Sequence, residues 1–196
     1  MSARHPAWCA NADDRCEHSA ELFLHRSRAR TIVTASGQVL QAWTEQFAAF
    51  YSPATAATSV VLTLIGGATV RLTGPQARTL GSHLAELAGM LTSFDLVARA
   101  PGVEPHPTWC AWASTADGNA CRDRAYTRHH LTEMFEVLSN DGTLIEVEGG
   151  IWVSDLAASD PLITLDLDGQ EVMLTPAQAV ELAATLTPGH RWTSAA

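Results

Sequence analysis

The chain has 196 residues, of which 46% are hydrophobic and 17% charged, and its formal net charge is −9. This balance is that of a globular protein with one large domain or two small ones, and it excludes intrinsic disorder. The acidity argues against a general nucleic-acid binder, which neutralises phosphates with basic surface. No apolar run approaches the ~20 residues of a membrane-spanning helix. The first residues lack the apolar stretch of a secretory signal, so we expect a cytoplasmic protein that does not enter the membrane.

The first half predicts an irregular Cys/His segment, then four strands and a closing helix. The strands are expected at residues 30–34, 39–47, 60–65 and 69–72. Ser36-Gly37 predicts a hairpin turn, and residues 48–58 support no assignment. Thr73-Gly74-Pro75 predicts the start of the helix, with threonine as N-cap and proline in the first turn. The apolar face of that helix is expected to contain Leu80, Leu84 and Leu87.

The second half predicts the same order of elements. Its strands are expected at residues 135–139, 144–153, 162–167 and 171–174. Asn140-Asp141-Gly142 and Asp168-Gly169 predict tight turns, and Thr175-Pro176 predicts the start of a helix. The apolar face of this helix is expected to contain Val180, Leu182 and Leu186. The fold class is therefore α+β, and we expect each helix to cover the antiparallel sheet of about four strands in its own half.

Three ordered blocks of similar sequence indicate a duplication. His5-Pro6-Ala7-Trp8-Cys9 recurs as His106-Pro107-Thr108-Trp109-Cys110, and residues 70–84 match residues 172–186 at an offset of 102. Between these blocks, Cys16 and His25 match Cys121 and His130 at an offset of 105. The Pro/Gly-containing segment 101–105 reads as a linker. We therefore predict two repeated modules, residues 1–100 and 101–196.

The two halves differ in charge. Residues 1–100 carry eight arginines and seven acids, a net charge of +1, whereas residues 101–196 carry four arginines and fourteen acids, a net charge of −10. Alternating arginines in the first half would form a basic row on a strand: Arg26, Arg28 and Arg30. The acids that alternate in the second half are Glu146, Glu148, Asp166 and Asp168. Either these are solvated strand faces, or the halves dock with complementary charge.

Each half contains two cysteines and two histidines in the same order. The spacing is His5-x3-Cys9-x6-Cys16-x8-His25 in the first half and His106-x3-Cys110-x10-Cys121-x8-His130 in the second. Two thiolates and two imidazoles complete the tetrahedral shell of a structural zinc ion without solvent. Metal binding would also fold an otherwise irregular segment. The sequence therefore predicts two structural zinc ions, one in each Cys/His knuckle.

Other readings of these residues stay open. The cysteines pack well as buried thiols, and the histidines would then be incidental. Local disulfides, Cys9–Cys16 and Cys110–Cys121, would need an oxidising compartment. His18 is an alternative to His25, and His129 is an alternative to His130, but the register of the repeat favours His25 and His130. Trp8 and Trp109 either cover the knuckles and join the core or form a stacking platform for a base or sugar.

The His-Pro-x-Trp-Cys openings, the later Cys and His, and the closing Leu-Thr-Pro-x-Gln-Ala helix resemble a small uncharacterised domain family of actinobacteria and their phages. The resemblance covers most of both halves, so the chain looks like a tandem copy of that domain. In the family the first position of the opening is cysteine or histidine, which supports His5 and His106 as ligands. The first copy departs from the pattern at Gly74-Pro75. The resemblance implies a fold and a metal, but it carries no information about activity.

Three functions compete. The favoured one is a non-enzymatic regulatory or adaptor protein that binds another protein, because four protein ligands leave the metal no open position. The second is a nucleic-acid-binding regulator that uses Arg26, Arg28 and Arg30. The third is a zinc-dependent hydrolase in which water replaces one ligand. Its candidate bases are Asp13, Asp14 and Glu17 in the first half and Asp117 and Asp123 in the second. The sequence leaves the oligomeric state open.

Overall fold

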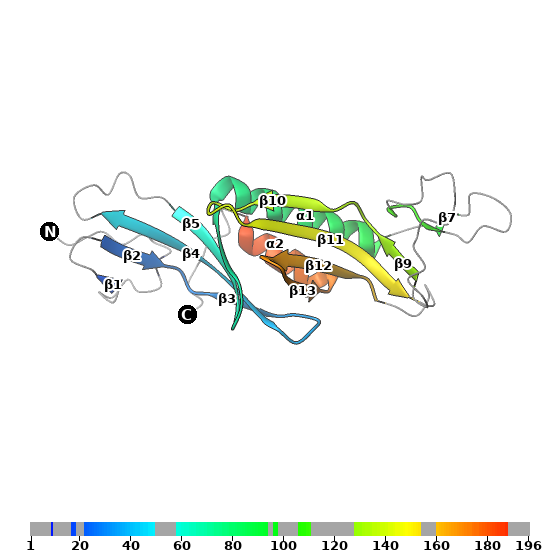
Figure 1. Cartoon of the computed structure of the whole chain (residues 1–196), viewed down its shortest axis with the longest axis horizontal. Helices are drawn as coiled ribbons and strands as arrows, with labels where there is room; N and C mark the ends of the chain where they lie inside the picture. Colours follow the sequence, from blue (N-terminus) through cyan, green and yellow to red (C-terminus); the bar gives the residue numbers. More distant parts are fainter. Residues whose placement is uncertain are drawn as a thin grey trace.

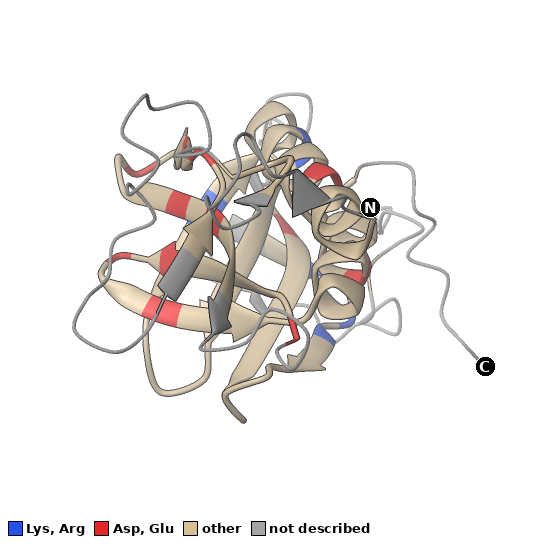
Figure 2. Ribbon diagram, turned by 90° about the vertical axis from the view of Figure 1, so that its right-hand side faces the viewer, with Lys and Arg blue, Asp and Glu red and all other residues tan. Residues whose placement is uncertain are grey.

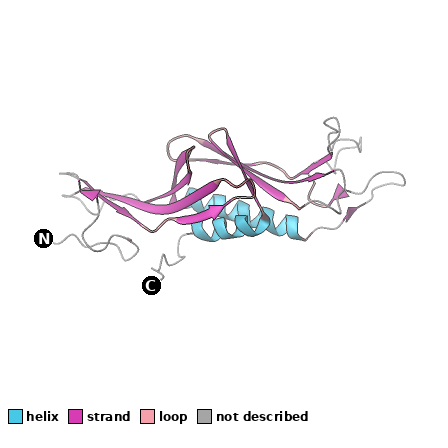
Figure 3. Ribbon diagram, turned by 90° about the horizontal axis from the view of Figure 1, so that it is seen from below, coloured by secondary structure: helices cyan, strands magenta, loops and turns pink. Residues whose placement is uncertain are grey.

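The computed structural model describes Cys9 and residues 17–18, 22–49, 58–93, 96–97, 106–110, 128–153 and 160–187. Its strands form two larger antiparallel sheets and one short two-stranded sheet. Two helices pack side by side and lie on one side of the larger sheets (Figure 3). The predicted α+β class is therefore confirmed. Within the described residues, neither helix is long and apolar enough to cross a bilayer.

The first sheet is built on one long strand. Its strands are β1 (Glu17–His18), β2 (Leu22–Arg26), β3 (Arg30–Val33), β4 (Val39–Ala49), β5 (Thr58–Leu64) and β6 (Thr69–Thr73). They follow the order β1-β2-β4-β5-β6, and β3 also pairs with β4. Figure 1 shows β2 beside the long strand β4. β4 is eleven residues long, so β3 and β2 pair with it one after the other along one side while β5 pairs along the other.

The second sheet has the same arrangement. Its strands are β9 (Arg128–Leu131), β10 (Phe135–Leu138), β11 (Leu144–Val153), β12 (Leu162–Leu167) and β13 (Gln170–Leu174). The order is β10-β11-β12-β13, and β9 also pairs with β11. The register corresponds as well, because His25 pairs with Gln46 and His130 pairs with Ile151. The third sheet joins β7 (Leu96–Val97) to β8 (His106–Pro107).

A hydroxyl group interrupts the hydrogen-bond ladder at the same place in both sheets. Ser27 N donates to Thr44 O, and Thr44 N donates to Ser27 Oγ, both over 2.9 Å. In the second half, Thr132 N donates to Gly149 O over 2.8 Å, and Gly149 N donates to Thr132 Oγ1 over 2.9 Å. Because a side chain takes the place of a backbone acceptor, the chain leaves the ladder and re-enters it as β3 or β10.

β2 and β9 correct the prediction that the Cys/His segments are irregular throughout. β4 also continues to Ala49, and β5 begins at Thr58, inside the stretch that supported no assignment. β2 and β9 are five and four residues long, and they pair with residues much further along the chain. Such short segments carry little periodic signal, because their strand conformation depends on the partner strand.

The helices α1 (Gly74–Thr92) and α2 (Pro176–Leu186) begin where the sequence predicts. Thr73 and Thr175 are the N-caps, and each forms a capping box with the glutamine three residues later. The backbone N–H of each threonine donates to the side-chain oxygen of its glutamine over 2.8 Å. These local bonds satisfy backbone groups that a helix leaves without partners at its start.

The predicted apolar face is confirmed for α1 and partly wrong for α2. Leu80, Leu84 and Leu87 are buried, and so are Leu182 and Leu186. Val180, however, is 52% exposed. Residues three and four positions apart share a helix face, so Leu182 and Leu186 continue onto Ala179 and Ala183, which are buried.

Each helix packs on both sheets, although we expected it to cover only its own. α1 contacts β10, β11 and β12 in addition to β5 and β6, and α2 contacts β3 and β4 in addition to β12 and β13. A helix is about 10 Å wide, and four strands spaced about 4.8 Å apart are wider than that. One helix therefore leaves part of a sheet uncovered, and two adjacent helices cover both sheets together.

The hairpin of each half also lies against the edge strand of the other half. Asn140 N donates to Arg71 O over 2.9 Å, and Ala35 N donates to Met173 O over 2.8 Å. The first bond joins β6 to the hairpin that follows β10, and the second joins β13 to the hairpin that follows β3. Together with the strand pairs within each sheet, these bonds link the two sheets at both edges. The edges of β6 and β13 are thereby partly covered, which protects them from pairing with other chains.

Both halves contribute to one contiguous core. Its buried residues come from the inner faces of both sheets and from both helices, and Trp109 and Phe135 pack against it. The linker predicted at residues 101–105 lies outside the described residues. The division into modules 1–100 and 101–196 stays a prediction, but the described parts of the two halves share one core.

Candidate functional site

The structure describes the side chains of four predicted metal ligands. These are Cys9, His25, Cys110 and His130, with exposed fractions of 6%, 4%, 5% and 4%. The backbone of His106 is described in β8, whereas His5, Cys16 and Cys121 lie outside the described residues. The four described ligands occupy corresponding places in the two halves, and all are buried.

The knuckle of the second half contains a tight turn between its first two predicted ligands. Cys110 N donates to Pro107 O over 3.1 Å, which reverses the backbone after His106. β8 pairs with β7, and Trp109 packs against the core. The prediction that this tryptophan joins the core is therefore confirmed for the second half. Trp8 lies outside the described residues.

The two predicted metal sites are far apart. β2, which carries His25, and β9, which carries His130, lie at opposite ends of the long axis of the molecule (Figure 1). Each site has only two described ligand side chains. Within the residues that the structure describes, no group of three or more His, Cys, Asp or Glu side chains is placed to hold a metal ion.

The alternative ligands and the candidate bases fall mostly on undescribed parts of the chain. The side chains of His18, His129 and Glu17 lie outside the described residues. The remaining candidate bases also lie outside them: Asp13, Asp14, Asp117 and Asp123. The preference for His25 over His18, and for His130 over His129, therefore stays a prediction from the register.

The three arginines of the predicted basic row do not lie on one strand. Arg26 ends β2, Arg28 lies in the break after it, and Arg30 begins β3. Arg28 and Arg30 are exposed, whereas Arg26 is half-buried beside Glu45. The alternation in the sequence is broken because Ser27 bonds to Thr44 and takes the chain out of the ladder.

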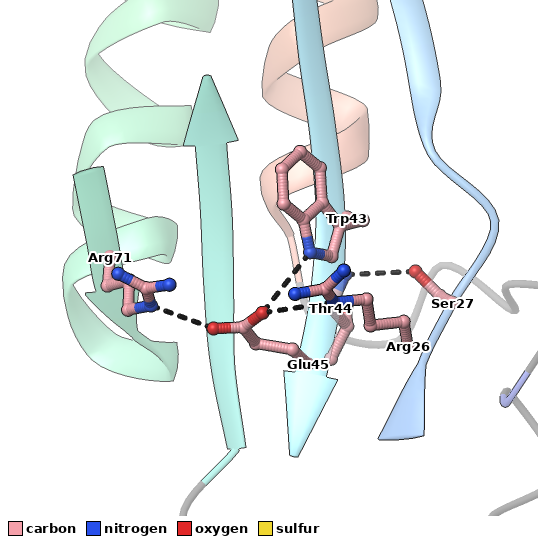
Figure 4. A network of polar contacts seen from close by, with 6 residues as sticks. All are labelled: Arg26, Ser27, Trp43, Thr44, Glu45 and Arg71. Carbon is pink, nitrogen blue, oxygen red and sulfur yellow. Dashed lines mark hydrogen bonds and ion pairs between the residues drawn. The ribbon is translucent and has the colours of Figure 1, made fainter. Parts of the chain in front are cut away.

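Sequence reasoning missed a polar cluster around Glu45 on the face of the first sheet opposite the helices (Figure 4). The Glu45 side chain is fully buried. Arg71 Nε donates to Glu45 Oε1 over 2.8 Å, and Arg26 Nε lies 3.5 Å from Glu45 Oε2. Trp43 Nε1 donates to the same Oε2 over 3.4 Å, and Arg26 Cζ lies 6.0 Å from the centre of the Trp43 ring. Two arginines and a tryptophan thus surround one buried carboxylate.

The sequence offers only a weak signal for this cluster. Glu45 is an acid within a predicted strand, and its partners come from β2 and β6. Arg26 is its cross-strand partner, and Arg71 is reached across β5. These contacts depend on the register of four strands, so they can be found only once the sheet is known.

The second sheet carries a row of carboxylates on the face opposite the helices. Glu136 pairs with Glu146, Glu146 pairs with Asp166, and Asp166 pairs with Glu171 across four adjacent strands. Figure 2 shows acidic positions on several strands. The row that corresponds in the first sheet is uncharged and consists of Thr31, Gln41, Thr63 and Thr69.

Glu148 lies beside this acidic row, two residues after Glu146 on β11. Partial burial raises the pKa of Glu148, and the nearby charges of Glu146 and Glu171 raise it further. The acidic alternation that the sequence predicted is confirmed for Glu146 and Glu148 on β11, and Asp166 pairs with Glu146 from β12. Asp168 lies instead in the turn after β12, where its φ is 56° and that of Gly169 is 77°.

Comparison of the chain with protein-family models, curated proteins and solved structures found no match.

Proposed function

We propose that the chain is a non-enzymatic tandem protein in which each module is stabilised by one structural zinc ion and which binds another protein. The observation that carries this proposal is the burial of a cysteine and a histidine at corresponding places in the two halves. Cys9 and His25 are 6% and 4% exposed, and Cys110 and His130 are 5% and 4% exposed. Thiolate sulfur and imidazole nitrogen are the ligands that a tetrahedral zinc site uses.

Burial favours a structural zinc site over a catalytic one. A catalytic zinc keeps a position open to water and substrate, whereas a structural zinc is enclosed by four protein ligands. The remaining ligands would be His5 and Cys16 in the first half and His106 and Cys121 in the second. The histidines on β2 and β9 would tie each Cys/His segment to its sheet, so that the energy of metal binding contributes to folding.

Zinc content tests the metal part of the proposal. The full chain, purified in reducing buffer, should contain two zinc ions by mass spectrometry of the metal. Cys9→Ser and His130→Asn should each lose one ion, and chelation should lower the melting temperature. His83→Asn is the control, because His83 is on α1 and is not a predicted ligand. A chain without zinc that keeps its melting temperature after chelation would contradict the proposal.

Exposed apolar side chains on the two hairpins support a protein partner. Val33 and Leu138 occupy corresponding positions at the ends of β3 and β10, and both are exposed. In the first half, Val33 pairs with Val39, and Ile65 N donates to Val39 O, so these apolar residues are neighbours across the sheet. Large apolar side chains that adjoin one another on a surface are typical of protein-binding sites.

Replacing these apolar residues tests the protein partner. Val33→Asn combined with Leu138→Asn should abolish the capture of a partner from the native host, while the melting temperature changes little. Val180→Asn is the matched control, because Val180 is similarly exposed but lies on α2. Partner capture that survives the double substitution would contradict binding through the hairpins.

A further inference from the structure

Two arginines on the outer face of the first sheet have terminal groups that the fold does not use. Arg26 and Arg71 both approach Glu45 through Nε, from opposite sides (Figure 4). In the part of the chain that the structure describes, the terminal Nη groups of both arginines make no hydrogen bond or ion pair. Both side chains are 44% exposed, so these groups are accessible from solvent.

The cluster around Glu45 keeps a net positive charge. Two guanidinium groups face one carboxylate, and guanidinium groups stay protonated in proteins. Glu45 is fully buried and holds both arginines in place, while Trp43 lies beside Arg26. A ligand therefore meets donors that are already oriented, which lowers the entropy lost on binding.

The second half shows that the fold does not require this cluster. Leu131 and Gly150 are cross-strand partners, as Arg26 and Glu45 are in the first half. Met173 occupies the place of Arg71. In the first sheet Arg71 pairs with β5, which pairs with β4, and in the second sheet Met173 pairs with β12, which pairs with β11. Replacing a buried ion pair with apolar residues is often neutral or stabilising. The first sheet thus carries three charged residues at positions where the second sheet folds with uncharged ones.

We propose that Arg26 and Arg71 bind a phosphoryl group. A carboxylate has two oxygens in one plane, which the fork of a single guanidinium satisfies. A phosphate monoester has three terminal oxygens in a tetrahedral arrangement, and can accept from two guanidinium groups at once.

Titration with inorganic phosphate tests the proposal on the full chain. The readouts are the nuclear magnetic resonance signals of the Nε–H groups of Arg26 and Arg71 and of the indole N–H of Trp43, at constant ionic strength. We expect saturable shifts of all three signals. Arg71→Lys should weaken binding severalfold, because lysine keeps the charge and loses the fork.

The decisive variant gives the first sheet the residues of the second: Arg26→Leu, Glu45→Gly and Arg71→Met together. It should fold, as judged by signal dispersion and melting temperature, and it should bind phosphate at least tenfold more weakly. Arg78→Gln is the matched control, since it removes one exposed charge from α1 in the same half. Equal losses in the control and the triple variant, or no saturable shift in the unmodified chain, would overturn the proposal.

Two further probes identify the source of the phosphoryl group. Adenosine monophosphate represents a small ligand with a phosphate monoester, which has three terminal oxygens. A short single-stranded oligonucleotide represents a nucleic-acid backbone, whose phosphates are diesters with two. Binding of either probe that the triple variant abolishes supports the site. Tighter binding of the oligonucleotide, with a steep salt dependence, would assign the site to nucleic acid. If the triple variant bound both probes as tightly as the unmodified chain, the proposed site would be contradicted.

Discussion

Glu148 lies among carboxylates on the outer face of the second sheet, and its raised pKa has a consequence for stability. Burial is the main cause of the shift, followed by the charges of Glu146 and Glu171. The folded chain therefore holds this proton more tightly than the unfolded chain does. The stability that Glu148 contributes is fully present below its ordinary pKa, and it is lost as the pH rises through the raised pKa.

We therefore expect Glu148→Gln to increase the free energy of unfolding near neutral pH by roughly 0.5 kcal/mol, the size of a like-charge effect across strands. Below the ordinary pKa of a glutamate the two proteins should be equally stable, because both side chains are then neutral. Urea unfolding at several pH values measures this difference. Glu181→Gln on the exposed face of α2 should have little effect at any pH, and a gain as large there would refute the explanation.

The side chain of Gln178 forms hydrogen bonds to two separate parts of the fold. Its Oε1 accepts from Thr175 N over 2.8 Å and completes the capping box of α2. Its Nε2 donates to Val33 O in the other half over 2.6 Å. Gln76 does the same for α1 and Leu138. Each helix start is thereby bonded to the hairpin of the opposite half.

Gln178→Glu separates these two roles. Glutamate keeps the acceptor for Thr175 and suits a helix N-terminus, so the cap alone predicts no loss of stability. It also replaces the donor to Val33 O with a second oxygen, so we expect a loss of about 1–2 kcal/mol in the free energy of unfolding. Ala177→Glu, which adds the same charge one residue earlier, should be nearly neutral. If Gln178→Glu left the free energy of unfolding unchanged, the hydrogen bond to Val33 O would contribute nothing to stability.

At the scale of elements, the two helices approach each other closely at small residues. A Cβ atom on Gly81 would lie 3.1 Å from Ala183 O, whereas a Cβ on Gly89 would have no neighbour within 4 Å. The first glycine is therefore needed for helix packing, and the second is not.

These two glycines form a matched pair on α1. Gly89→Ala should stabilise the chain by roughly 0.5–1 kcal/mol, through helix propensity alone. Gly81→Val should destabilise it by about 2 kcal/mol, because the added atoms separate α1 from α2. Thermal unfolding of both variants checks the pair. Equal effects at the two sites would show that the helix crossing does not limit side-chain size.

At the scale of the whole molecule, the shared core predicts that both halves unfold together. Leu91 is in α1, yet its Cδ1 lies 2.9 Å from the position of a Cβ on Gly149 in β11. Leu91→Ala should lower the free energy of unfolding by about 2–4 kcal/mol, and the loss should be seen in the amide exchange of both sheets. Hydrogen exchange of amides in β5 and β12 measures each half separately. Val180→Ala on the surface of α2 should leave both rates unchanged.

Equal acceleration of exchange in both sheets is the expected outcome for Leu91→Ala. A change confined to one sheet would show that the halves are independent folding units, in spite of the core that joins them in the described residues. The two results also bear on the predicted modules 1–100 and 101–196, since only independent units would keep their structure when separated.

Local patterns determined much of the fold and part of the candidate site. The capping boxes at Thr73 and Thr175, the turn at Asp168-Gly169 and the main strands were predictable, because each depends on a few neighbouring residues. The repeated order of Cys and His also singled out Cys9, His25, Cys110 and His130, all of which proved to be buried. Zinc itself stays a prediction.

Only the tertiary structure decided how the two halves join. The sequence already assigned the acidity to the second half, but only the pairing of the strands aligns its acids in one carboxylate row and brings Arg26 and Arg71 together around Glu45 in the first half. The strands β2 and β9, the sharing of the helices and the burial of Glu45 between Arg26 and Arg71 all depend on contacts between residues far apart in the chain. Sequence periodicity reports which face of an element is apolar, but not which distant element that face will meet.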